Sequence, residues 1–63
     1  MKEWNATHKI IHPLGIDLVM LVESVAYTER EWEGYDTADY EVVDGYWLFQ
    51  GQPFQGEVIP LMK

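Results

Sequence analysis

The sequence predicts an all-β protein, a small five-stranded antiparallel barrel of the SH3-like size class. Two observations and one physical argument support this prediction. Asp44-Gly45 lies between two short runs of β-branched and aromatic residues, which is a strong signal for a hairpin. Further runs with β propensity alternate with turns marked by glycine and proline. Closure into a barrel would remove the exposed strand edges that invite aggregation.

The first strand is predicted at residues 4–12, where Thr7, Ile10 and Ile11 favour β structure. The segment His12-Pro13-Leu14-Gly15 follows it and carries turn chemistry. Proline presets φ at the second position of a turn, and glycine suits the fourth. We therefore expect the chain to reverse direction at this segment.

Residues 16–28 form the most apolar run, and they fit both a helical stripe and an alternating strand. Branched residues at positions 16, 19, 22 and 25, together with the preceding glycine, favour the strand. Both faces of this strand would be apolar, so we expect it to be central or strongly bent. The alternative is an α+β fold, with a helix at 16–28 packed on a small sheet.

Residues 29–38 are polar, contain a glycine and lack a sustained period, so they predict a loop. The alternation of Glu29, Glu31 and Glu33 is also compatible with the preceding strand continuing into this segment. Residues 50–56 predict a second loop. A last short strand is expected at 57–61, where Pro60 limits it to an edge or a strand end.

A two-residue loop at Asp44-Gly45 fixes which residues of the hairpin face each other. The predicted pairs are Val43 with Tyr46, Val42 with Trp47, Glu41 with Leu48, and Tyr40 with Phe49. The side chains predicted to point inward are those of Tyr40, Val42, Trp47 and Phe49. The apolar side chains predicted to point outward, beside acidic residues, are those of Val43, Tyr46 and Leu48.

The length of 63 residues predicts one domain spanning residues 1–63, whose stability is marginal. The chain contains no cysteine, which excludes disulfides and thiolate metal sites. It also has no apolar run of about 18 residues, the length of a membrane span, and no secretory leader pattern. We therefore expect a cytoplasmic protein that does not bind membranes.

The formal net charge of −7 is confined to one part of the chain. Acidic and basic residues balance in 1–22 and in 45–63, whereas Arg30 is the one basic residue in 23–44. The acids of that part are Glu23, Glu29, Glu31, Glu33, Asp36, Asp39, Glu41 and Asp44. Such a field repels phosphate backbones, which argues against direct nucleic-acid binding, and it steers a basic partner inward.

No pattern in the sequence predicts a metal, a cofactor or a catalytic centre. His8 and His12 would lie about 13 Å apart on a strand, too far for one ion. Asp36, Asp39 and Glu41 do not fit a calcium-binding loop. No nucleophile with a neighbouring base is visible, and a chain this short has little room for a closed active site. We therefore expect that the protein is not an enzyme.

The leading functional hypothesis is a noncatalytic interaction module that docks a basic protein surface through residues 29–44. Aromatic side chains would anchor the contact and carboxylates would select lysine or arginine. The candidate partner-binding residues are Glu29, Glu31, Trp32, Glu33, Tyr35, Asp36, Glu41, Val43, Tyr46 and Leu48. For the aromatic members, the structural alternative is that they fold back and cover the open end of the barrel.

Two other functions compete with this hypothesis. Glu29, Glu31 and Glu33 would lie about 6.6 Å apart if extended, which is close to the spacing of phosphates. The chain could then be a nucleic-acid-mimicking inhibitor of a DNA- or RNA-binding protein. The third function is structural, a homodimer or assembly subunit that uses Val43, Tyr46 and Leu48 as a self-complementary patch.

Overall fold

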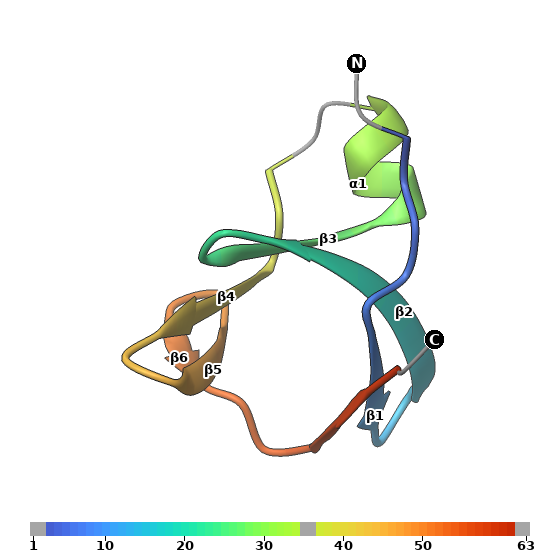
Figure 1. Cartoon of the computed structure of the whole chain (residues 1–63). Helices are drawn as coiled ribbons and strands as arrows, with labels where there is room; N and C mark the ends of the chain where they lie inside the picture. Colours follow the sequence, from blue (N-terminus) through green and yellow to red (C-terminus); the bar gives the residue numbers. More distant parts are fainter. Residues whose placement is uncertain (1–2, 35–36, 62–63) are drawn as a thin grey trace.

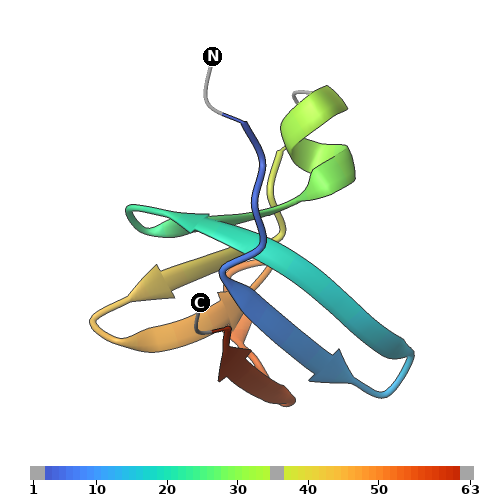
Figure 2. The same cartoon turned by 45° about the vertical axis from the view of Figure 1, so that its right-hand side comes forward.

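The computed structural model describes residues 3–34 and 37–61 and shows one curled antiparallel sheet in the form of a half-barrel (Figure 1). Its seven strands lie in the order β6-β5-β4-β3-β2-β1-β7. The elements are β1 His8–His12, β2 Gly15–Val22, β3 Val25–Thr28, α1 Glu29–Gly34, β4 Tyr40–Val43, β5 Tyr46–Phe49, β6 Gln52–Pro53 and β7 Glu57–Pro60. The second view shows how strongly β2 bends as it passes from β1 to β3 (Figure 2).

The all-β class is confirmed, whereas a five-stranded SH3-like barrel is not. Among the described residues the sheet has seven strands, and β6 and β7 form its two edges without pairing with each other. The alternative with a helix at 16–28 is wrong, because β2 and β3 occupy this run. The single continuous sheet bends strongly and so encloses its inner face, as closure into a barrel would.

The β1–β2 hairpin confirms the turn predicted at His12-Pro13-Leu14-Gly15, since His12 pairs with Gly15. The first strand is shorter than predicted and begins at His8 instead of Trp4. Residues 3–7 still lie along β2, because the Thr7 N–H donates to the Val19 carbonyl at 2.8 Å. The Leu21 N–H also donates to Thr7 Oγ1 at 2.8 Å.

The run predicted as one strand at 16–28 is in fact a hairpin. The chain reverses at Glu23-Ser24, and Val22 pairs with Val25. Glu23 has φ of 57°, a left-handed conformation that is uncommon for residues other than glycine. The expected central position is confirmed, because β2 lies between β1 and β3.

The loop predicted at 29–38 is wrong over its first half, where α1 forms. Thr28 and Glu31 make a capping box at the start of this helix. The Glu31 N–H donates to Thr28 Oγ1 at 3.3 Å, and the Thr28 N–H donates to Glu31 Oε1 at 3.0 Å. These two bonds satisfy backbone donors that the first helical turn would otherwise leave unpaired.

The β4–β5 hairpin has the predicted register, with Val43 opposite Tyr46 and Tyr40 opposite Phe49. Asp44 and Gly45 have φ of 52° and 83°, as a type I′ turn requires. The loop predicted at 50–56 contains the short strand β6, which pairs with β5 after a second tight reversal. The last strand, β7, lies at the sheet edge as predicted, and it ends at Pro60, one residue earlier than predicted.

The core lies on the inner face of the curl and takes one side chain from each of four successive strands. These buried residues are Ile10, Val19, Ala26 and Tyr40. Leu21, Trp47, Phe54 and Val58 pack against them. The inward set predicted for the hairpin is therefore confirmed for Tyr40 and Trp47, whereas Val42 is half-buried and lies outside this core. The prediction fails in part for Phe49, which remains 37% exposed because it lies at the mouth of a cleft.

The outer face of the β2–β3 hairpin is covered as well. Met20, which is 2% exposed, pairs with Tyr27 on this face. Trp4 Nε1–H donates to the Tyr27 carbonyl at 2.9 Å, and the Tyr27 ring contacts the Trp32 ring of α1 at 5.3 Å between centroids. This coverage explains the apolar residues Met20 and Tyr27, whereas Ile16 and Leu18 on the same face remain 61% and 46% exposed.

Candidate functional site

A cleft of about 710 Å³ opens at one end of the half-barrel. It is bordered by the β1–β2 hairpin, the start of α1, the segment before β4 and the chain around β6. Because these elements are distant in sequence, only the curl of the sheet brings them together. The lining combines carboxylates, a histidine and aromatic rings, and it contains no lysine or arginine among the described residues.

Asp17 enters this cleft because of the register of β1 and β2. It lies directly opposite Ile10, so it shares the inner face with that core residue. His12 Nε2 lies 2.8 Å from Asp17 Oδ2, and the Leu14 N–H donates to His12 Nδ1 at 3.2 Å. Since Nδ1 accepts that bond, Nε2 carries the proton and donates it to the carboxylate. The turn thus orients the histidine, and the histidine orients Asp17.

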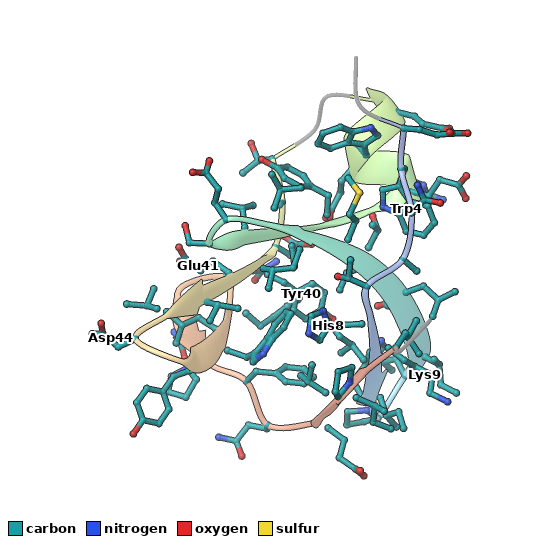
Figure 3. All side chains as sticks on the ribbon, in the orientation of Figure 1. Trp4, His8, Lys9, Tyr40, Glu41 and Asp44 are labelled. Atoms are coloured by element: carbon teal, nitrogen blue, oxygen red, sulfur yellow. The ribbon has the colours of Figure 1, made fainter. Side chains whose placement is uncertain are left out.

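Tyr40 is 5% exposed and lies at the floor of the cleft, inside the curl (Figure 3). Burial is the main reason that the pKa of its hydroxyl is raised to about 12. The charge of Asp17, a hydrogen bond to its side chain, and the charges of Asp39 and Glu31 raise this pKa further. Three carboxylates from separate elements therefore influence the Tyr40 hydroxyl.

Glu31 has a structural role that the sequence interpretation missed. Its carboxylate is half-buried, closes the capping box of α1 and also lines the cleft. Asp39 lies across from it just before β4, where its Oδ1 accepts a hydrogen bond from Gln50 Nε2 at 3.4 Å. Both acids are thus held in place by the local structure.

Aromatic rings form the other wall of the cleft. The Tyr40 ring lies 5.1 Å from the Phe49 ring and 5.6 Å from the Phe54 ring, measured between centroids. Phe54 is fixed by its N–H, which donates to the Trp47 carbonyl at 3.1 Å. Ring faces and carboxylates are the groups that bind ammonium and guanidinium ions in proteins.

The structure divides the predicted partner-binding residues between two places, which lie apart in both views (Figures 1 and 2). In α1, Glu29 and Glu33 are exposed, whereas Glu31 and Trp32 are half-buried. Tyr35 and Asp36 lie outside the described residues.

The second place is the outer face of the β4–β5 hairpin. Tyr46 is 74% exposed and Val43 is 44% exposed, while Glu41 and Leu48 are half-buried. Val43, Tyr46 and Leu48 line a second cleft of about 560 Å³, together with side chains that include Trp47 and Val58. This cleft lies on the open side of the half-barrel, between the hairpin and β7.

Sequence interpretation missed the polar part of the first cleft, namely His12, Asp17 and Asp39 as a group. One signal was present, because Asp17 is the single charged residue in the run that forms β2. Its inner-face position could not be derived without the register of β1 and β2. The hydrogen bond from the Leu14 N–H shows that His12 stabilises its own turn.

Within residues 3–34 and 37–61, no group of three or more histidine, cysteine or acidic side chains could hold a metal ion. In the same part of the chain, no helix has the length and apolarity needed to cross a membrane. Comparison with protein-family models, with curated proteins and with solved structures found no significant match.

Proposed function

We propose that this chain is a noncatalytic acidic module that docks a basic protein surface through residues 29–44. The observation that carries this proposal is the lack of charge compensation. Within the described residues, the one short contact between a basic and an acidic side chain joins His12 to Asp17, and no lysine or arginine pairs with an acid of the 29–44 segment. Acids left uncompensated attract a partner that brings the opposite charge.

The local structure supports this role. Glu29 and Glu33 are four residues apart on α1, so they lie on one exposed helix face. Glu41 lies on the outer side of the curl, as does Asp44 at the tip of the hairpin (Figure 3). The partner would therefore meet α1 and the outer side of β4 first.

The geometry favours this module over a mimic of a phosphate path. The spacing of about 6.6 Å between alternate acids requires an extended chain. Glu29, Glu31 and Glu33 lie on α1 instead, where they point in different directions around the helix, and Glu31 caps its start.

The test is a pull-down with the immobilised chain, in which bound proteins are identified by mass spectrometry. Glu29→Lys combined with Glu33→Lys should reduce the amount of bound basic protein by about tenfold, because two attractions become repulsions. The matched control, Glu3→Lys with Glu57→Lys, changes the net charge equally at two exposed positions outside the segment. Equal retention by both double variants would contradict the proposal.

Self-association is a second candidate function, favoured by the cleft beside Val43, Tyr46 and Leu48. A largely exposed tyrosine next to an apolar hollow is typical of an interface. Sedimentation velocity at increasing protein concentration should then show a dimer that Tyr46→Ser weakens. A monomer at all concentrations would exclude this function.

A further inference from the structure

We propose that the 710 Å³ cleft binds a guanidinium group, the end of an arginine side chain presented by the basic partner; this inference rests on the proposed function. It goes further by assigning one side chain of the partner to one place in this fold. The cleft would then hold the anchoring side chain of the partner, and the exposed acids of α1 would form the charged rim of the same contact.

The carboxylates of the cleft converge from three elements. Asp17 comes from β2, Glu31 from α1 and Asp39 from the segment before β4. Each makes one or two hydrogen bonds within the chain, whereas a carboxylate has about four lone-pair sites. Acceptor positions therefore remain for the N–H groups of a ligand. The Asp17 side chain is 44% exposed, so a ligand can reach it.

The rings of the opposite wall select the kind of cation. Phe49 is 37% exposed, and its ring and that of Phe54 flank the Tyr40 ring in tilted and edge-on arrangements. A flat, weakly hydrated guanidinium stacks on such faces while its N–H groups reach carboxylates at its edge. A lysine ammonium is strongly hydrated and lacks this flat surface, so we expect it to bind more weakly.

A metal ion fits this cleft poorly, since the described residues offer no cluster with ligand geometry for one. The carboxylates lie around a hollow with an aromatic wall instead of around a single point. Such a combination suits a cation that is several atoms wide, with charge at its rim and an apolar face.

The experiment is an NMR titration of the intact, isotope-labelled chain with two short peptides. One peptide is acetyl-Gly-Gly-Arg-Gly-Gly-amide, and the other carries citrulline, which is flat but uncharged, in place of arginine. The arginine peptide should shift the amide signals of residues lining the cleft and bind about tenfold more tightly than the citrulline peptide. A lysine peptide should fall between them.

Asp17→Asn should weaken binding of the arginine peptide about tenfold, because it removes a charge and leaves the shape almost unchanged. Asp39→Asn gives the same test independently, in case the first variant fails to fold. The matched control is Glu57→Gln, an exposed carboxylate that does not line the cleft. Equal affinity for arginine and citrulline, or shifts confined to residues outside the cleft, would overturn this proposal.

The two proposals can fail separately. The pull-down changes Glu29 and Glu33 and measures capture of whole proteins, whereas the titration changes Asp17 or Asp39 and measures one side chain. Capture that depends on α1 without selective arginine binding would overturn the cleft assignment alone. Selective arginine binding without capture of basic proteins would overturn the docking role of residues 29–44.

Discussion

The side chain of Tyr40 belongs to both the core and the cleft of this protein. Its ring packs among Ile10, Val19 and Ala26, while the charge of Asp17 in the cleft raises the pKa of its hydroxyl. The sequence predicted the buried ring from the hairpin register. It did not predict the polar partner, because Asp17 lies on a different hairpin.

The ionisation of Tyr40 should make stability fall in alkali. Its pKa rises from 10.0 to about 12 in the folded state, chiefly through burial. The unfolded chain therefore ionises first, so the stabilisation is complete below pH 10 and is lost as the pH rises toward 12. At pH 11, midway between the two pKa values, the loss should amount to about 1 kcal/mol.

Urea unfolding at pH 8 and at pH 11 measures this effect, with Tyr40→Phe as the comparison. The variant has no hydroxyl at this position, so it should lose much less stability between the two pH values. An equal loss in both proteins would show that the alkaline effect arises elsewhere.

Position 56 requires glycine, because the backbone there lies too close to neighbouring atoms to leave room for a side chain. A Cβ atom at this position would contact the Ile11 carbonyl oxygen and the Phe54 ring. Gly56→Ala should therefore destabilise the fold by about 1–3 kcal/mol, as overpacking does. Gln55→Ala, at an exposed neighbouring position, should change the urea midpoint very little.

At the scale of elements, α1 depends on the capping box between Thr28 and Glu31. Thr28→Ala removes the oxygen that accepts the Glu31 N–H and should cost about 1 kcal/mol. Amide hydrogen exchange should become faster in α1 first, while Thr28→Ser keeps the acceptor and the slow exchange. Unchanged exchange in the alanine variant would show that packing of Trp32 holds the helix without the cap.

The same elements show what sequence can and cannot predict. The hairpin at Asp44-Gly45 was predictable to the residue, because its turn type demands those residues. The reversal at Glu23-Ser24 was missed because neither residue marks a turn strongly, and Glu23 adopts a rare left-handed φ. The capping box, Thr28 followed three residues later by Glu31, was readable in the sequence but was hidden within a stretch interpreted by its charge.

The residues of the two clefts also differ in how far the sequence predicts their positions. The exposure of Val43 and Tyr46 followed from the strand alternation of a single hairpin. The cleft depends instead on the order in which four strands lie side by side and on the curl of the sheet. The strand order and the curl do not follow from the local sequence pattern. The position of Asp17 also depends on the register, because a shift by one residue between β1 and β2 would place its side chain on the outer face of the sheet.

At the scale of the whole molecule, the fold buries a small apolar core within the curl, and few acids of the described residues lie beside a basic side chain. The net charge of −7 is far from zero for 63 residues. We expect this charge to attract cationic partners over about one Debye length. The strength of docking should consequently fall as salt is raised.

The most direct measurement is an NMR titration of the labelled chain with a peptide of several arginines, at low salt and at 0.5 M salt. The account predicts shifted amides in α1, in residues 37–41 and around the cleft, and much weaker binding at the higher salt. Shifts centred on β7, or an affinity that does not change with salt, would contradict it.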